Sequence, residues 1–196
     1  MASPRTKNQV PRWIQNPYPH VEHVLISFPR EHVLLVVLNR PEHMNCLPFG
    51  TVMELNVLWK WYDLEPELRC AVLTGAGSKS FSTGMDLKEM LHSLQTNDIH
   101  RDFPSGGSAG LSNRAGKKPI IVACNGYAHG RTMSVEEAHN WGLVKEIVPQ
   151  DKLLERALDY ADEIAALSPD SIIITRLAAR EAWETGGNDS WARDVG

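Results

Sequence analysis

The sequence has few cysteines and none of the spacings that would give them a metal or disulfide role. Its three cysteines, Cys46, Cys70 and Cys124, lie in or beside apolar runs and form no CxxC pair. We therefore expect buried, reduced thiols rather than a disulfide framework or a zinc site. The eight histidines are scattered and contain no HExxH pattern, so the sequence predicts no metal centre.

Long hydrophobic runs and an excess of basic residues are also missing. No apolar stretch approaches the roughly 20 residues of a membrane-spanning helix. The formal net charge is −4 and the pI is near 6.1, so we expect neither nucleic acid nor a membrane as a partner. Neither of the two main glycine-bearing loops matches GxxxxGK[ST] or GxGxxG, which argues against phosphate transfer and dinucleotide binding.

The length and composition favour one domain. A chain of 196 residues with 42% hydrophobic residues can bury one sizeable core. Residues 1–20 contain four prolines, which exclude the amphipathic helix of a mitochondrial presequence, and we expect an irregular N-terminal arm there. Residues 21–196 would form the single domain. Neither terminus carries a clear targeting signal.

Three continuously apolar runs predict strands that are buried on both faces. They are Val33–Leu38, Cys70–Thr74 and Ile120–Cys124. Between the first two, residues 51–62 have apolar side chains at helical spacing, so strand, helix and strand follow in the order of a parallel crossover. Residues 21–27 are expected to pair ahead of them as an edge strand. The sequence thus predicts an α/β fold.

The last third of the chain predicts helices. Ser134 and Glu137 form a capping box for a helix that ends at Trp141-Gly142. Asp151 is expected to cap a second helix with one apolar stripe, formed by Leu154, Leu158, Ala161 and Ala165. Ser168-Pro169 should begin a third helix that stops at Gly186-Gly187.

Two glycine-bearing turns, residues 82–86 and 125–130, each follow a predicted parallel strand. Ligands of α/β folds bind at this carboxyl edge of the sheet. Gly84 stands just before an expected helix start at Asp86, so the amides of Met85 and Asp86 should be unpaired and able to bind an anion, or an oxygen that becomes one. The alternative is an ordinary turn in which Asp86 only caps its own helix.

Five segments, in this order, resemble the enoyl-CoA hydratase/isomerase, or crotonase, family. They are LNRPEHMNCL (38–47), LTGAGSKSFSTGMDLKEM (73–90), KKPIIVACNGYAHG (117–130), SVEEAHNWGLVKEIVP (134–149) and SPDSIIITRLAAREAWE (168–184). The resemblance implies crotonase-like repeated ββα units with C-terminal helices. It also implies an acyl-CoA thioester as substrate, with coenzyme A as part of that substrate and no separate cofactor. Family members commonly assemble as trimers or hexamers.

The chemistry implied by the resemblance runs through an enolate of the thioester, whose oxygen is held by two backbone amides. Matched by motif, Met85 and Gly130 would supply these amides. Thr83 and Gly84 would shape the first loop, and Asp86 would cap the following helix.

Further substrate contacts are implied in two places. Leu87 and Lys88 would lie along the pantetheine and nucleotide, although Lys88 also fits a solvated helix lysine. Residues 45–47 match the turn near the adenine, but Cys46 and Leu47 fit plain core packing equally well.

The chain departs from the family pattern after Gly130. There the family continues into further glycines and a helix bearing a glutamate, and a second glutamate follows later. Here Arg131 leads at once into the capping box, so we expect several tens of residues to be absent at 130–131, with both acid/base glutamates among them. The nearest titratable residues are His129, Glu136 and Glu137, and none has a clear catalytic role. The C-terminus is also shorter than the family's, and apolar residues such as Val122 and Leu143 should be left uncovered.

Three hypotheses follow. The first is a hydratase/isomerase that acts on an acyl-CoA. The second is a catalytically inactive acyl-CoA-binding protein or subunit partner, and the third is a shortened product that does not fold properly. The acyl group, the pathway and the compartment (peroxisome, mitochondrion or cytosol) stay open.

Overall fold

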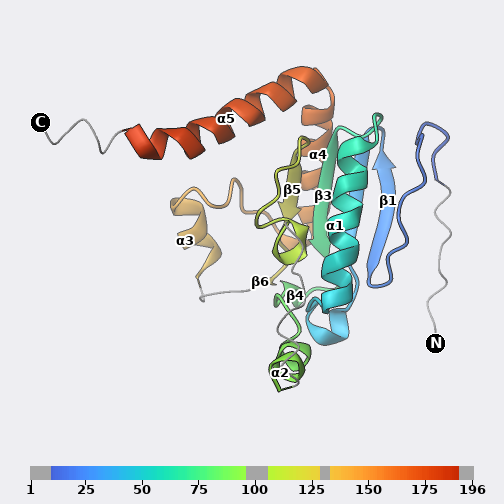
Figure 1. Cartoon of the computed structure of the whole chain (residues 1–196), viewed down its shortest axis with the longest axis vertical. Helices are drawn as coiled ribbons and strands as arrows, with labels where there is room; N and C mark the ends of the chain where they lie inside the picture. The colour runs from blue at the N-terminus through green and yellow to red at the C-terminus, as the bar shows by residue number, and fades with distance from the viewer. Residues whose placement is uncertain (1–9, 96–105, 129–132, 190–196) are drawn as a thin grey trace, which may run out of the picture.

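A computed structural model describes residues 10–95, 106–128 and 133–189 of the chain. Its centre is a β-sheet with helix α1 on one face and helix α4 on the other (Figure 1). The strands are β1 (Val24–Arg30), β2 (Val33–Leu38), β3 (Cys70–Gly75), β4 (Ser80–Ser82), β5 (Ile120–Ala123) and β6 (Tyr127–Ala128). The helices are α1 (Phe49–Leu64), α2 (Leu87–Gln95), α3 (Val135–Asn140), α4 (Leu153–Ala165) and α5 (Pro169–Asp189). Short 3₁₀ turns are η1 (Pro41–His43), η2 (Ser108–Gly110) and η3 (Gln150–Lys152).

The main sheet has the strand order β1-β2-β3-β5. β2, β3 and β5 run parallel, as their apolar runs predict, and β1 joins the edge antiparallel to β2. The edge strand begins at Val24, three residues later than expected. β4 and β6 form a second, two-stranded parallel sheet.

Alternation along β2 explains why the run VLLVVL is apolar throughout. Leu34 and Val36 pack into the cluster that contains α1, whereas Val33 and Leu35 pack against α4. Because a strand sends successive side chains to opposite faces, a strand covered on both faces has no position for a polar residue.

Helix α1 supplies the largest part of the core. Pro48 precedes its first turn, and Val52, Leu55, Trp59 and Tyr62 repeat at helical spacing and are buried against the sheet. The Nε1 of Trp59 donates to the carbonyl of Ala109 at 2.9 Å, which satisfies its one polar group. The predicted helix over residues 51–62 is confirmed with two further residues at each end.

The later helices confirm the expected elements but correct three details. Ser134 accepts a hydrogen bond from the Glu137 amide at 3.0 Å, which confirms the cap of α3. Asp151 does not cap α4, because it lies within η3 and Lys152 holds the cap position. Leu154 is 39% exposed and lies outside the buried stripe, where Ala157 stands in its place. Helix α5 runs through both glycines to Asp189, since glycine ends a helix only where the backbone turns left-handed.

Apolar side chains are uncovered on β5 and after α3, as the expected loss of a segment predicts. Val122 is 50% exposed and Leu143 is 69% exposed. Cys124 is exposed as well, which corrects the expectation of three buried thiols; Cys70 is buried and Cys46 is half-buried. β5 has β3 on one side only among the described residues, so its far edge and its outer side chains lack cover.

Residues 10–20 contain no helix or strand. The buried Glu65 carboxylate holds them by accepting hydrogen bonds from the amides of Gln15 at 3.0 Å and Asn16 at 2.9 Å. These hydrogen bonds outweigh the effect of burial and keep the pKa of Glu65 below its ordinary value. The division into an arm, 1–20, and a domain, 21–196, stays a prediction.

Candidate functional site

The two glycine-bearing turns leave the sheet at its carboxyl edge. β3 and β5 are parallel neighbours, and beyond them β4 pairs with β6 in the same direction, with Ser80 opposite Tyr127 and Ser82 opposite Ala128. The chain that enters residues 83–86 therefore starts beside the chain that leaves Ala128. His129 and Gly130, which were predicted to follow, lie outside the described residues.

Two buried asparagines fasten this edge. The Asn125 side chain acts like a further rung of the ladder, because its Oδ1 accepts from the Gly75 amide at 2.9 Å and its Nδ2 donates to the Gly75 carbonyl at 2.7 Å. Asn45, with a left-handed φ of 52°, donates from Nδ2 to the carbonyls of Ala76 at 2.9 Å and Ser80 at 2.8 Å. Sequence reasoning missed both roles, although for Asn125 a polar amide directly after an apolar run was a usable signal.

The loop that carries Met85 is held from both sides by Leu47. The Leu47 amide donates to the Gly84 carbonyl at 2.8 Å, and the Leu47 carbonyl accepts from the Asp86 amide at 3.0 Å. The predicted free amide at Asp86 is therefore wrong, because this short bridge uses it. Within residues 10–95, 106–128 and 133–189, the Met85 amide has no hydrogen-bond acceptor. Gly84 has φ of 81°, a conformation that favours glycine.

Asp86 caps helix α2 and also faces a cation. Its Oδ1 accepts from the Lys88 amide at 3.1 Å, and its Oδ2 lies 3.5 Å from Nη1 of Arg40. Burial alone would raise the pKa of Asp86, but hydrogen bonds from the Cys46 thiol and from the amides of Lys88 and Glu89 hold it below its ordinary value. The carboxylate is therefore ionised at neutral pH.

The remaining predicted site residues lie around this loop. The Thr83 amide donates to the Met44 carbonyl at 3.2 Å, which fixes the loop at its start. Leu87 and Lys88 are exposed on the first turn of α2, where an extended ligand could reach them. Leu47 is buried in the core, whereas Cys46 is half-buried and its thiol contacts Asp86. Met85 itself is half-buried.

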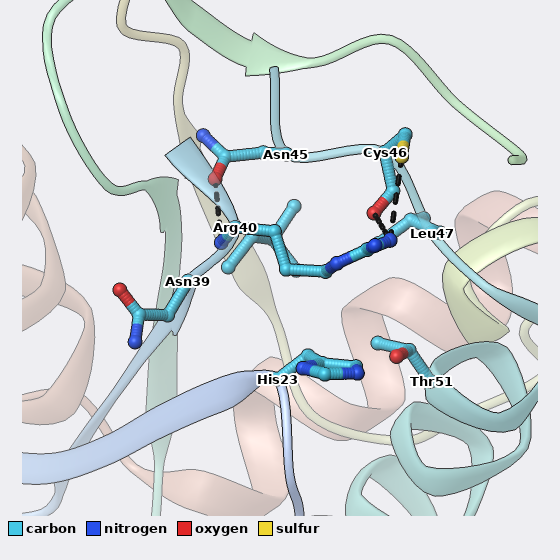
Figure 2. A pocket seen from close by; sticks show the side chains of 8 residues that line it. His23, Asn39, Arg40, Asn45, Cys46, Leu47 and Thr51 are labelled. Atoms are coloured by element: carbon cyan, nitrogen blue, oxygen red, sulfur yellow. Dashed lines mark hydrogen bonds between the residues drawn. The ribbon is translucent and has the colours of Figure 1, made fainter. Parts of the chain in front are cut away.

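A small hollow that is almost filled by its own side chains lies under the Asn45 turn (Figure 2). It is lined by His23, Leu38, Asn39, Arg40, Asn45, Cys46, Leu47 and Thr51. The Arg40 side chain crosses it and points its guanidinium at Cys46 (Figure 2), and the remaining space does not admit a water-sized molecule. The pocket is thus a packed joint between two turns rather than a substrate cavity.

Candidate acid/base and metal groups are sparse in the described part of the chain. No three histidine, cysteine or carboxylate side chains there come together as metal ligands, and none of its helices is long and apolar enough to traverse a membrane. Glu136 is exposed on α3, and the Glu137 amide is used by the Ser134 cap. Helix α3 buries none of its residues.

Solved structures match this arrangement over most of its length. A carnitinyl-CoA dehydratase from Mycobacterium avium 104 is 25% identical, covers 81% of this chain and 82% of its own, and superposes with a TM-score of 0.71. Pseudomonas aeruginosa DspI superposes with a TM-score of 0.74 at 19% identity over 85% of this chain and 84% of its own, and so speaks for the fold alone. The fold is the mixed α/β, crotonase-like fold.

Sequence comparison identifies the family. The model of the enoyl-CoA hydratase/isomerase family matches residues 29–131 and 128–189. The chain is 35% identical to a mevalonyl-coenzyme A hydratase of Beauveria bassiana, across 85% of this chain and 81% of the relative. It is 30% identical to an (E)-benzylidenesuccinyl-CoA hydratase of Thauera aromatica, across 76% and 78%. The chain belongs to the enoyl-CoA hydratase/isomerase family.

The comparisons also bear on the segment that is expected to be absent at residues 130–131. The two matched stretches meet at residues 128–131, directly after β6. The alignment with the Beauveria bassiana relative runs over 229 residues, more than the 196 of this chain, so that relative has residues without a counterpart here. That these residues include the acid/base glutamates stays a prediction.

Proposed function

We propose that this protein binds an acyl-CoA thioester at the carboxyl edge of its sheet and stabilises the enolate of that thioester, as an acyl-CoA hydratase would. The observation that carries the proposal is the Met85 amide, which has no acceptor among the described residues and stands at the start of α2, where the helix dipole favours negative charge. Gly130 would supply the second amide.

The parallel pairing of β4 and β6 supports this assignment. A single oxygen can accept from two amides only if the two loops approach each other, and the pairing of Ser82 with Ala128 brings together the residues that precede the two loops. Thr83 and Gly84 would set the first loop, Asp86 would cap the helix, and Leu87 and Lys88 would contact the extended CoA portion.

In hydration, the oxygen of water bonds to C3 of a 2-enoyl thioester while a base takes the proton that water gives up. The electrons of the C2–C3 double bond form a C1–C2 double bond while those of the carbonyl double bond move onto the thioester oxygen. The enolate then takes a proton at C2 and the carbonyl re-forms. The two amides act on the charged oxygen, where they stabilise the enolate more than the substrate. Proton transfer needs a separate group.

A catalytically inactive acyl-CoA-binding protein or subunit partner is the second candidate function. The expected absence of residues at 130–131 favours the inactive protein, because the family model matches in two separate stretches that meet where the acid/base helix should follow. An inactive protein of this kind would keep the Met85 loop and bind thioesters without converting them.

The decisive variant is Met85→Pro. The Leu47 bridge uses only the Gly84 carbonyl and the Asp86 amide, so proline at position 85 removes one unused N–H and no atom that the bridge needs. Met85→Leu keeps the amide and is the matched control. We expect Met85→Pro to lower turnover by a factor of about 10²–10³ and Met85→Leu to stay close to wild type.

Turnover is measured with crotonyl-CoA and with mevalonyl-CoA, the compound named in two of the relatives. Calorimetry with acetyl-CoA and with free CoA measures binding separately. Binding of acetyl-CoA without turnover of either substrate would select the inactive protein, and equal behaviour of the proline and leucine variants would refute the role of the Met85 amide. Absence of both binding and turnover would refute the proposed function.

We also propose self-association through the uncovered surface around β5. Val122 on β5 is half exposed, and uncovered apolar side chains at an open strand edge are characteristic of interaction surfaces. A well-dispersed monomer with a sharp, concentration-independent thermal transition would contradict this.

A further inference from the structure

Arg40 lies two residues after the end of strand β2 and closes the turn that leads to Leu47. Its amide donates to Oδ1 of Asn45 at 3.0 Å, and its carbonyl accepts from the Asn45 amide at 2.9 Å. The backbone of Arg40 is thereby tied to the residue that also bonds the carbonyls of Ala76 and Ser80. The backbone from which the Arg40 side chain extends is therefore fixed in position.

The guanidinium joins the two turns that surround Met85. Its Nη1 donates to the Cys46 carbonyl at 3.2 Å and to Cys46 Sγ at 3.3 Å, and lies 3.5 Å from Asp86 Oδ2. Figure 2 shows the side chain directed at the carbonyl and the sulfur of Cys46. The Cys46 thiol in turn donates to the same Asp86 oxygen at 3.5 Å. Arg40 therefore links the residue before Leu47 to the residue after Met85.

The environment makes this link stronger than a surface ion pair. The side chains of Arg40 and Asp86 are 16% and 21% exposed, so salt and water screen their attraction only in part. A planar guanidinium can keep several acceptors in one geometry, whereas a lysine ammonium is a point charge on a flexible stem. The contacts of Arg40 thus suit holding a shape more than supplying charge.

We infer that Arg40 is a positioning residue that orients the Met85 amide toward the thioester oxygen by clamping Cys46 and Asp86 on either side of the Leu47 bridge. The inference rests on the proposed function, in which Met85 is an oxyanion donor. Arg40 touches no reacting atom in this role. Its effect reaches the substrate through the direction of one N–H bond.

The first measurement needs no ligand. Amide hydrogen exchange reports the two Leu47 bridge bonds, through the amides of Leu47 and Asp86. We expect Arg40→Met to speed exchange at both amides by about tenfold or more, and Arg40→Lys to give a smaller increase. Arg30→Lys is the matched control, because Arg30 pairs with Glu155 and Asp162 of α4, and it should leave these two amides unchanged. Unchanged exchange in both Arg40 variants would overturn the inference.

The second measurement uses the carbonyl stretch of bound acetyl-CoA, labelled with ¹³C at the thioester carbon. Hydrogen bonds to a carbonyl lower this frequency, so wild-type protein should shift it below the value in water. In Arg40→Lys the shift should shrink, while the affinity for free CoA stays within about threefold, because Arg40 acts on the oxygen and not on the nucleotide. A merely structural role would weaken CoA binding and leave the remaining bound fraction fully shifted.

The outcomes separate the two proposals. A shifted carbonyl in wild type that is equally shifted in Arg40→Lys would support the oxyanion role of Met85 and overturn the role of Arg40. An unshifted carbonyl in wild type would refute the proposed function, and the positioning role with it. If Arg40→Met does not fold, Arg40→Lys and Asp86→Asn provide the same exchange test, since Asp86→Asn keeps a capping oxygen but removes the carboxylate charge.

Discussion

Strands β2 and β5 are similar in sequence and differ in their surroundings. Both are runs of aliphatic residues, yet β2 is buried almost throughout while Val122 of β5 is half exposed. Leu73 of β3, the register partner of Val122, is 1% exposed. An apolar strand is buried only if it has a neighbour on each side and a helix on each face, and β5 meets neither condition fully.

The largest contrast should come from two tryptophans. Trp59 is 2% exposed inside α1, whereas Trp141 is 65% exposed after α3. We expect Trp59→Ala to lower the free energy of unfolding by about 3–5 kcal/mol, because it leaves a large cavity, and Trp141→Ala to change it by less than about 0.5 kcal/mol. Urea unfolding followed by circular dichroism measures both. Similar losses for the two variants would contradict the comparison.

The free energy of unfolding is expected to depend on pH through Lys118. Lys118 precedes β5, and its ammonium donates to the carbonyls of Tyr62 and Glu65. Burial lowers the pKa of Lys118 to about 8, while Asp63, Glu65, Lys117 and Arg114 also act on it.

In the unfolded chain this lysine titrates near its ordinary value of about 10.4. Between about pH 8 and pH 10 the unfolded state therefore binds the extra proton, and stability from this group rises with pH by at most about 1.4 kcal/mol per unit. Burial raises the pKa of Cys70 to about 12, which acts in the opposite direction from about pH 9 upward. The contribution of Lys118 is therefore measured as the difference in free energy of unfolding between wild type and Lys118→Met at each pH. The contribution of Cys70 is the same in both proteins and cancels. A constant difference across this range would show that Lys118 stays charged in the folded protein.

Substitutions on the two edge strands, β1 and β5, should have the smallest effect on stability. One of them should have a clear effect on self-association. Leu25 on β1 is 52% exposed, close to the exposure of Val122 on β5. Val122→Lys should reduce self-association because a charge on an open strand edge opposes pairing. Leu25→Lys is the matched control and should not alter association. Both should change the free energy of unfolding by less than about 0.5 kcal/mol, and sedimentation velocity at several concentrations distinguishes them.

Periodicity was enough to predict the sheet and its first helix. The apolar runs gave β2, β3 and β5 and their parallel order, because buried strands leave an unbroken signal. The same signal failed at Cys124 and Leu154, since an apolar residue beside a strand or on a helix is buried only if a partner element covers it. No local pattern in the chain reports whether that partner exists.

The candidate site was predictable only at the level of its loops. Gly84 and Asp86 marked a helix start, and the family resemblance pointed to Met85. The pairing of the Asp86 amide with Leu47 and the link from Arg40 to Asp86 join residues 39 and 46 positions apart. Contacts of this kind depend on the register of the sheet, which a single sequence does not contain.

Asn125 also limits the chemical lifetime of the protein. In a flexible chain, an asparagine before glycine loses its side-chain amide readily, because the unhindered glycine nitrogen attacks the side-chain carbonyl. Here Nδ2 is held by the carbonyls of Gly75 at 2.7 Å and Gly77 at 2.8 Å, which keeps the group away from that attack. Deamidation would place a carboxylate against those two oxygens and weaken the join between the chain after β5 and the end of β3. Each time the protein unfolds, these hydrogen bonds are lost and Asn125 can deamidate irreversibly.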